Sequence, residues 1–460
     1  MFRSINRLIL PQTRSRWCRF YQGRPMTVTP GIDDHVSNVV LIKSADPKFL
    51  SIELQMEDTE SLRIPLVWLR DHCRSEKFYD YKTNQRKSNV TSLFDQARLS
   101  MHKVPFEFDK KHQLLTVRWE DGHESTFNSK ELLDWAVFTR KDYDECASRT
   151  LWNASTLREI PSVSSQNFDF AVFARLFVRF GVAAVLGVES RNEKATKKLC
   201  ESIAPYHGTF FGDFWVFGTN EKPNEAAYDK HEDSAYGNAE IGPHNDGTYM
   251  DQTPGIQVLH CLRQANEGGE NIFVDGFAAA EQLKKERPDL FDVLATTPVE
   301  HHYLEGLDSP NFGSDDYFDE DPSTVNEKRK EKLHARSVGK PVLHCFKHKV
   351  NQITFNPYDR APLRTLRVVE LDASAAERNV ELTVLWYEAY EKLSQIIHNE
   401  NNALKVKLQP GTVVFFDNTR ILHARSGFEG HRKMCGCYLS RDGFLAKARP
   451  LLTSDYYKHI

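Results

Sequence analysis

Short apolar runs bounded by turn residues are the feature that most constrains how this chain can fold. The run Thr412 to Phe416 follows a Pro-Gly turn and reads as a buried strand, and the next apolar run carries His423. Only one long helix is well marked, near residues 380–398. This pattern favours a mainly β fold with flanking helices. We therefore expect a double-stranded β-helix, or jelly roll, in residues 146–450.

A smaller β-rich domain is expected in residues 35–145. The runs VVLIK, LRIPLVWL and LLTVRW read as short strands, and an Asp-Gly pair supplies a turn into another strand ending near Phe127. Two domains suit a chain of 460 residues, since a single core seldom grows beyond about 250 to 300 residues. Residues 308–340 break the strand pattern with clustered acids followed by KRKEK, which predicts a solvated, mobile insertion.

Charge and hydropathy argue against two classes of function. The formal net charge of −4 gives no basic field for nucleic acid. No uninterrupted apolar stretch approaches the roughly 20 residues that span a bilayer. The eight cysteines are scattered, which suits a reducing compartment better than a disulfide framework. We expect a soluble protein with a small-molecule partner, no nucleic acid and no membrane.

The first thirty residues differ from the rest. They hold six arginines, and no acidic residue occurs before Asp33. Phe2, Ile5 and Ile9 can share one side of a short amphipathic helix. This composition is typical of a mitochondrial transit peptide, with a disordered basic tail as the alternative. We predict that residues 1–30 direct the chain to the mitochondrial matrix.

Three His-x-Asp/Glu triplets occur, about as many as chance predicts from this composition. The triplet at His231 lies in a polar segment that reads as a solvated loop. In the triplet at His398, the first and third residues diverge by about 200° around a helix. His244 and Asp246 precede a strand-like run, and residues two apart on a strand face the same way. These two side chains can present a nitrogen and an oxygen to one metal ion.

His423 offers a third ligand, although taken alone it reads as a surface histidine. Two histidines and one carboxylate form the facial triad of non-haem Fe(II) oxygenases. Arg432 and Tyr438 share one face if HRKMCGCYLSRD is a strand, and a buried arginine suits a carboxylate. A dicarboxylic acid that chelates iron and meets Arg432 describes 2-oxoglutarate. Asp417 and Asn418 can orient the ligands or simply form a turn.

Five segments carry a family resemblance: HNDGTYMDQTPGIQVLHCL, GGENIFVDGF, FNPYDR, FFDNTRILHAR and CGCYLSRD. They closely resemble the γ-butyrobetaine and trimethyllysine dioxygenases, Fe(II)- and 2-oxoglutarate-dependent hydroxylases of carnitine biosynthesis. The upstream pieces VWLRDHCRS, KTNQR, LWNA and IPSV extend the resemblance over residues 35–450 and look more like the trimethyllysine branch. The resemblance implies His244, Asp246 and His423 as iron ligands and Arg432 as the contact for 2-oxoglutarate.

The resemblance also implies a substrate pocket. An aromatic cage for a trimethylammonium group, in which each π face contributes roughly 0.5 to 2 kcal/mol, maps to Phe211, Trp215, Tyr236 and Tyr438. Asp233 maps to an aspartate that pairs with the α-ammonium of trimethyllysine. The chain departs from the family at Phe211, where tyrosine is usual, and around Asp246, where Asn245 and Gly247 replace a threonine-containing pattern.

The implied reaction is C3 hydroxylation of N6-trimethyllysine, the first step of carnitine biosynthesis. Fe(II) is the cofactor, 2-oxoglutarate and O₂ are co-substrates, and ascorbate and a homodimer are expected by resemblance. One alternative is γ-butyrobetaine dioxygenase activity or hydroxylation of another betaine. Another is a non-catalytic binding protein on the same fold.

The family's N-terminal domain often carries a zinc ion held by several cysteines and a histidine. Here only Cys73 and His123 occupy matching positions, while Ser75 and Phe78 stand where related proteins can have cysteines. Two protein ligands rarely hold structural zinc. We predict a domain that folds without zinc.

Overall fold

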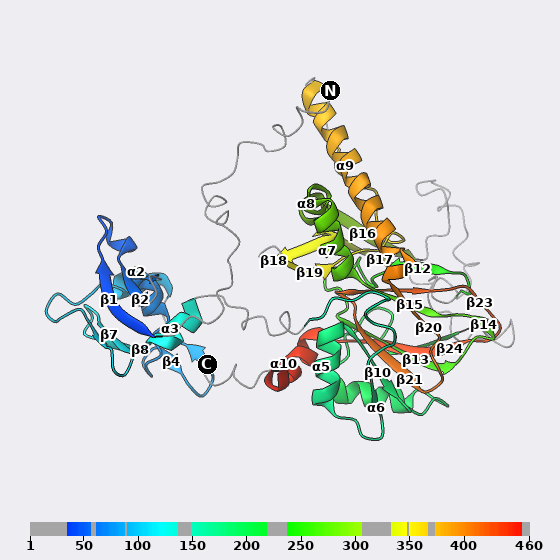
Figure 1. The fold of residues 1–460 in the computed structure, drawn as a ribbon, viewed down its shortest axis with the longest axis horizontal. Coiled ribbons are helices and arrows are strands. Elements are labelled where there is room, and N and C mark those ends of the chain that lie inside the picture. The colour runs from blue at the N-terminus through cyan, green and yellow to red at the C-terminus, as the bar shows by residue number, and fades with distance from the viewer. Residues whose placement is uncertain are drawn as a thin grey trace, which may run out of the picture. The chain divides into compact units, whose positions relative to one another are not determined.

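The structure is a computed structural model, and it describes residues 35–56, 61–87, 90–136, 149–218, 237–305, 333–346, 349–366 and 373–452. These residues fall into two compact units, one formed by residues 35–136 and the other by residues 149–452 (Figure 1). The predicted transit peptide, residues 1–30, lies outside the described residues. Among the described helices, none has the length and apolar character needed to cross a bilayer.

The described part of the N-terminal unit contains two three-stranded antiparallel sheets, with strand orders β1-β2-β3 and β6-β7-β8, and the two-stranded pair β4-β5. Ile52 and Leu54 of β2 and Leu115 and Val117 of β7 alternate with less buried residues and meet in one core. The sheet strands are β1 (Val36–Ile42), β2 (Ser51–Met56), β3 (Ser61–Pro65), β6 (Phe106–Asp109), β7 (Leu114–Arg118) and β8 (Glu124–Asn128). The other elements are η3 (Pro47–Phe49), α1 (Leu66–Asp71), β4 (Tyr79–Asp80), β5 (Gln85–Arg86), η4 (Val90–Ser92), α2 (Leu93–Gln96) and α3 (Ser129–Ala136).

One predicted strand of this unit is partly wrong. The run LRIPLVWL predicts a strand through Leu69, but β3 stops at Pro65 and residues 66–71 form α1. Leu66, Leu69 and Arg70 are buried in α1, at the three- and four-residue spacing of one helix face. A short apolar run is compatible with a strand or a buried helical turn, and packing against the core decides between them.

The four positions compared with a zinc site lie together. Cys73 Sγ is 3.4 Å and Ser75 Oγ is 3.2 Å from His123 Nε2. The Phe78 ring packs edge-on against the His123 ring, with centroids 4.8 Å apart. Hydrogen bonds and a ring contact therefore link these four side chains. Folding without zinc remains a prediction.

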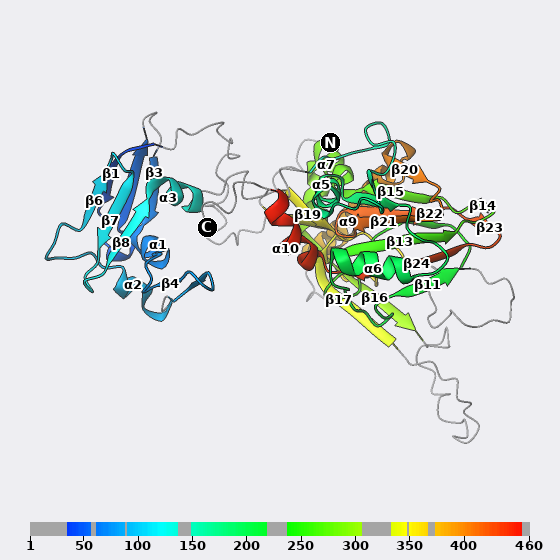
Figure 2. The ribbon, with the colours of Figure 1, turned by 90° about the horizontal axis from the view of Figure 1, so that it is seen from below.

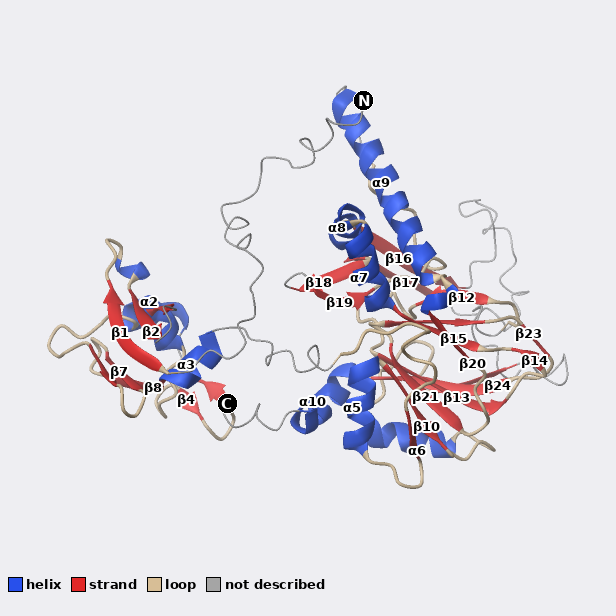
Figure 3. Cartoon of the chain, viewed as in Figure 1, coloured by secondary structure: helices blue, strands red, loops and turns tan. Residues whose placement is uncertain are grey.

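The second unit contains two facing sheets, and Figure 3 shows helices on both sides of their strands. Their facing sides share a core that includes Leu259, Phe273, Val414 and Phe416. The larger sheet has the order β11-β24-β13-β21-β10-β9: β9 (Ser162–Ser164), β10 (Val182–Leu186), β11 (Trp215–Gly218), β13 (Ile256–Arg263), β21 (Thr412–Asp417) and β24 (Lys433–Leu439). The smaller has the order β12-β22-β15-β20: β12 (Ile241–His244), β15 (Asn271–Asp275), β20 (Ala403–Val406) and β22 (Ile421–Arg425). The predicted strand from Thr412 is confirmed as β21.

Helices cover the outer sides of both sheets. Helix α5 begins at the Asp169 cap and ends at Gly181, whose φ of 73° suits glycine. Helices α5 (Phe170–Phe180), α6 (Lys194–Ile203) and α10 (Arg441–Leu452) pack on the larger sheet, and Figure 2 shows α6 over β13 and β24. Helices α7 (Gly276–Glu286), α8 (Pro288–Thr296) and α9 (Ala373–Ile397) pack beyond the smaller sheet. The long helix predicted near residues 380–398 is confirmed as α9.

The predicted insertion at 308–340 is wrong for residues 333–340. They belong to β17 (Leu333–Pro341), which pairs with β16 (Pro298–Glu305). Every second side chain from Leu333 to Ser337 is less exposed than its neighbours, a period that the surrounding charges obscure in the sequence. Residues 306–332 lie outside the described residues. The remaining elements are β14 (Glu267–Gly268), β18 (Leu343–Phe346), β19 (Lys349–Ile353), η8 (Glu400–Asn402) and β23 (Phe428–Glu429).

A buried ion pair fixes the start of β22. Arg420 donates to both carboxylate oxygens of Asp275, at 3.1 and 2.8 Å. The same carboxylate accepts the Trp152 backbone N–H at 3.1 Å and those of two residues in the first turn of α7. This network links β15, α7 and β22 just ahead of His423.

Candidate active site

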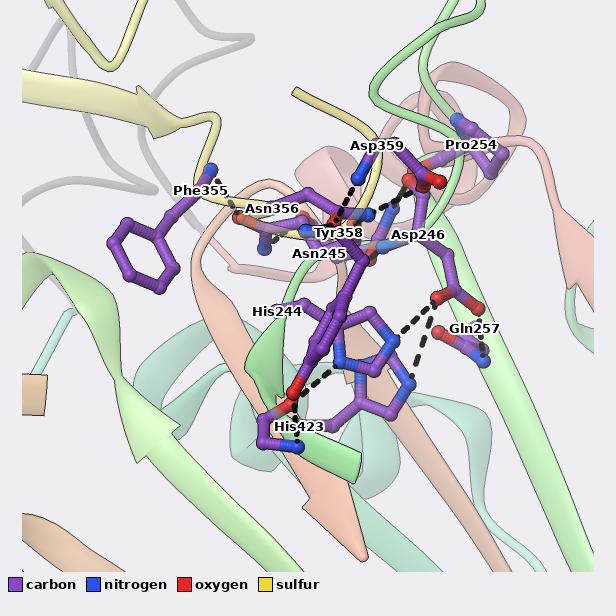
Figure 4. Close-up of polar contacts among 12 residues, drawn as sticks. His244, Asn245, Asp246, Pro254, Gln257, Phe355, Asn356, Tyr358, Asp359 and His423 are labelled. Carbon is purple, nitrogen blue, oxygen red and sulfur yellow. Dashed lines mark hydrogen bonds and ion pairs between the residues drawn. The ribbon is translucent and has the colours of Figure 1, made fainter. Parts of the chain in front are cut away.

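The predicted metal ligands lie together beside the paired strands β12 and β22 of the smaller sheet (Figure 4). His244 ends β12 and pairs in register with His423 of β22. Asp246 Oδ1 is 3.1 Å from His244 Nε2 and 3.7 Å from His423 Nε2. The ligand atoms of the three side chains all lie within 4.8 Å of one another. The arrangement brings two imidazole nitrogens and one carboxylate oxygen to one point.

Asp246 reaches this point from a turn and not from a strand, which corrects the prediction. Strand β12 stops at His244, and a turn begins at Asp246. Gly247 has a φ of +64°, and a Cβ there would lie 2.5 Å from Pro254 Cδ. Glycine thus permits both the left-handed backbone and the close approach. The departure from the family pattern at Gly247 has a structural reason.

Hydrogen bonding and burial set the protonation of the two histidines. His244 Nδ1 lies 2.8 Å from the Gly242 carbonyl oxygen, which fits an Nδ1–H donor; burial opposes protonation of His244, but the Asp246 carboxylate outweighs it and raises the pKa of His244. Burial and the neighbouring His244 lower the pKa of His423 to about 4. His423 is therefore neutral at pH 7. Neutral imidazole is the form that binds a metal ion.

The Asp246 carboxylate is oriented by two donors that bind one of its oxygens. Gln257 Nε2 and the Tyr438 hydroxyl each donate to Oδ2 at 2.7 Å, so Oδ1 is left facing the histidines. Burial opposes ionisation of Asp246, but the two histidines and the Tyr438 hydroxyl outweigh it and hold its pKa well below the usual range. Gln257 is missing from the sequence predictions. A single amide in the apolar run of β13 is the signal that marks it.

Asn418 holds the backbone of the Asp246 turn. Its Oδ1 accepts the Asp246 N–H at 3.0 Å, and its Nδ2 donates to the carbonyls of Asp246 and Pro254 at 2.9 and 2.8 Å. Asn245 Nδ2 donates to the Asn418 carbonyl at 2.7 Å. Both asparagine side chains are fully buried. Two roles were predicted for Asn418, orienting a metal ligand or forming a simple turn, and the structure favours the first. Asp417 instead contacts Thr419 and Arg441.

Replacing Asn418 with alanine is expected to weaken metal binding at the triad by about 10- to 100-fold, because outer-shell partners typically contribute that much. Three hydrogen bonds to the turn are lost, while His244, His423 and the Asp246 side chain remain. The measurement is Fe(II) affinity under anaerobic conditions, with exposed Asn399→Ala as the control. Unchanged Fe(II) affinity in Asn418→Ala would contradict this role.

A cavity of about 150 Å³ opens beside the triad. Its apolar wall is mostly aromatic and includes Phe211, Trp215, Phe217 and Tyr249. The Trp215 and Tyr438 rings are edge-to-face, with centroids 5.1 Å apart. Three of the four predicted cage residues, Phe211, Trp215 and Tyr438, therefore line one cavity with the triad. The fourth, Tyr236, lies outside the described residues, as does Asp233.

Two buried arginines also line the cavity. Arg432 precedes β24 and lies 3.5 Å, through Nη2, from Asn271 Oδ1. Burial and the neighbouring Arg425 lower the pKa of Arg432 to about 10, so it remains charged at neutral pH. Sequence reasoning missed Arg425. Its place two residues after His423 on β22 is the available signal, because such residues share a strand face.

Comparison with protein families defines the class. Residues 147–438 match the family described as "Taurine catabolism dioxygenase TauD, TfdA family", and residues 44–133 match "Gamma-butyrobetaine hydroxylase-like, N-terminal". The chain belongs to this TauD/TfdA dioxygenase family.

Individual proteins with similar sequences include trimethyllysine dioxygenases. The chain is 33% identical over 413 residues to the mitochondrial trimethyllysine dioxygenase of Gallus gallus, covering 87% of this chain and 86% of that protein. It is 32% identical over 402 residues to the human mitochondrial trimethyllysine dioxygenase, covering 85% and 83%. The solved structure of PvcB from Pseudomonas aeruginosa is 13% identical, with a TM-score of 0.39 over 75% of this chain and 95% of that chain. The predicted family and its trimethyllysine branch are confirmed.

Proposed function

We propose that this chain is an Fe(II)- and 2-oxoglutarate-dependent dioxygenase that hydroxylates N6-trimethyllysine at C3. The observation that carries the proposal is the cluster of His244, Asp246 and His423 ligand atoms within 4.8 Å, beside a cavity lined by Arg432. Trimethyllysine dioxygenases at 32 to 33% identity over most of the chain support the substrate. The presence of all four side chains argues against a non-catalytic binding protein.

The side chains fit the cofactor and its co-substrate. Two neutral imidazoles and an ionised carboxylate are the donor set of non-haem Fe(II) oxygenases, and His244, Asp246 and His423 would hold the ion. When bound, Fe(II) and 2-oxoglutarate supply the oxidising chemistry, in which O₂ is used, 2-oxoglutarate becomes succinate and CO₂, and a C–H bond is hydroxylated. Arg432 would bind the far carboxylate of 2-oxoglutarate by a charge-assisted contact. Ascorbate is a proposed supporting reductant.

Other side chains at the cavity orient the metal ligand Asp246 and contact the substrate. Gln257 and Tyr438 hold one oxygen of Asp246 so that the other faces the metal position. Trp215 and Phe211 offer π faces to a trimethylammonium group, which has no hydrogen-bond donor. Tyr438 thus joins the metal site to the cage, because its ring packs on Trp215 and its hydroxyl binds Asp246. Asp233 and Tyr236 remain proposed substrate contacts.

The wider setting is also proposed. The two facing sheets of residues 149–452 support a double-stranded β-helix, or jelly roll, as the catalytic domain, with residues 35–136 as a separate β-rich domain. Relatives named as mitochondrial support a mitochondrial location, and we assign residues 1–30 as a transit peptide to the matrix. A homodimer is proposed on family resemblance. The partner is a small trimethylammonium compound and not nucleic acid.

A succinate-release assay tests the function. Purified chain is incubated with Fe(II), 2-oxoglutarate, O₂ and either trimethyllysine, γ-butyrobetaine or no prime substrate. Trimethyllysine is expected to stimulate succinate formation most and to gain one hydroxyl group, detected as an added oxygen atom by mass spectrometry. A preference for γ-butyrobetaine would assign the sister activity, and no stimulated turnover would refute both.

Replacing Trp215 with alanine is expected to lower kcat/KM for trimethyllysine about two- to thirtyfold, because one π face of the cage contributes about 0.5 to 2 kcal/mol. Trp215→Phe retains a π face and serves as the matched control. The loss should lie mainly in KM. If the alanine and phenylalanine variants lose equal activity, the ring does not act as a cage wall.

A further inference from the structure

Among the residues that the structure describes, two carboxylates line the cavity, and one of them belongs to the metal cluster. Asp246 faces the two histidines, whereas Asp359 lies on the turn after β19, beside Asn356 and Tyr358 (Figure 4). We propose that Asp359 is a specificity residue whose carboxylate binds the α-ammonium group of an amino-acid substrate. This inference rests on the proposed function and adds Asp359 to Asp233 as a residue that contacts the amino-acid end of the substrate.

Asp359 is held in place by a buried amide. Asn356, which is 2% exposed, accepts the Tyr358 and Asp359 backbone N–H groups through Oδ1, at 2.9 and 3.1 Å. Its Nδ2 donates to Asp359 Oδ2 at 2.7 Å and to the Asn245 carbonyl at 3.1 Å. The Asp359 carboxylate is therefore tied, through one asparagine, to the residue between His244 and Asp246. Its orientation relative to the triad is set before any substrate binds.

The turn is also anchored on α9 and β16. The Phe355 and Tyr390 rings stack at 5.0 Å, and the Arg360 guanidinium lies 5.3 Å from the Trp386 ring. The His302 N–H donates to the Asp359 carbonyl at 2.9 Å. A carboxylate held on a rigid turn loses little conformational entropy when it binds a cation. This rigidity suits a residue that selects a substrate.

Hydrogen-bonding capacity explains why a second carboxylate is needed. A trimethylammonium group has no N–H and is met by aromatic faces such as Trp215, whereas an α-ammonium has three N–H donors that need acceptors. An ionised carboxylate can accept from several N–H donors at once, and the Asn356 amide is one donor to Asp359. A simple turn-closing role is the competing explanation. It predicts no dependence on the substrate's amino group.

The positively and negatively charged side chains that line the cavity have different surroundings. Arg425 and Arg432 each approach the Phe428 ring, with guanidinium carbons 5.1 and 5.6 Å from its centroid. Asp359 instead lies beside Asn356 and Tyr358, on a turn that the Asn356 amide ties to the Asn245 carbonyl. Carboxylates of a bound ligand are thus favoured near the arginines, and an ammonium is favoured near Asp359.

The test compares two substrates that differ only in the α-amino group: trimethyllysine and its desamino analogue, a trimethylammonio hexanoate. Asp359→Asn is expected to lower kcat/KM for trimethyllysine about ten- to a hundredfold, chiefly through KM, because a charge-assisted contact is lost. The desamino analogue should be turned over equally by wild type and variant. Asp359→Glu keeps the charge and should retain part of the preference. Asp251→Asn, an exposed aspartate, is the matched control.

Three other results of these assays would overturn the role of Asp359 or the proposed function. Equal losses on both substrates, or loss of Fe(II) or 2-oxoglutarate affinity in Asp359→Asn, would show a structural role and overturn the inference. Full trimethyllysine activity in Asp359→Asn would also overturn it, and Asp233→Asn, assayed in parallel, would then show whether that residue alone reads the ammonium. If wild type turns over neither substrate, the proposed function itself fails, and the inference fails with it.

Discussion

His244→Ala and His423→Ala should each lose substrate-dependent succinate formation while remaining folded. Each change removes one of the three proposed metal ligands, whose donor atoms lie within 4.8 Å of one another. The loss of turnover should exceed the loss, about 10- to 100-fold, that typically follows removal of a side chain that hydrogen-bonds to a metal ligand. Turnover, Fe(II) content and thermal melting are measured on the same preparations.

The control for these variants is His334→Ala, an exposed histidine on β17. It should keep wild-type Fe(II) content and turnover. Because His423 lies on a paired strand between β12 and β15, its truncation should leave the strand pairing in place. Wild-type turnover in either ligand variant would remove that histidine from the metal site.

Arg432→Met should raise the KM for 2-oxoglutarate at least tenfold. Methionine keeps much of the side-chain bulk but removes the charged fork, and breaking a charge-assisted pair in a buried site costs about 2 to 5 kcal/mol. The pKa of about 10 means that wild-type Arg432 is charged throughout the neutral range. The measurement is initial-rate kinetics with 2-oxoglutarate varied at saturating trimethyllysine.

Arg432→Lys is the informative partner variant. It keeps the positive charge but cannot make the two parallel contacts of a guanidinium, so its KM should lie between those of wild type and Arg432→Met. The KM for trimethyllysine should change little in both variants. If the trimethyllysine KM rises while that for 2-oxoglutarate stays constant, Arg432 belongs to the prime-substrate site.

The period and spacing of apolar residues were sufficient to predict several elements of the fold from the sequence. The apolar run after Pro410 predicts β21, and helical recurrence predicts α9, because both elements are buried along most of their length or on one continuous face. The parity of Arg432 and Tyr438 places both toward the same cavity. Where charge is dense, as in β17, or the apolar run is short, as in α1, the pattern is ambiguous and the predictions are partly wrong.

The sequence by itself determined the donor types of the candidate metal site, because residue identity fixes which atoms can bind a metal. The tertiary structure decided which oxygen of Asp246 faces the histidines, through Gln257, Tyr438 and Asn418. Asn418 lies 172 residues from Asp246 along the chain, and Tyr438 lies 192 residues from it. Asp359 likewise lies at the cavity on a turn that Asn356 ties to Asn245. Contacts of such sequence separation have no local period, so they exist only once the sheets have packed.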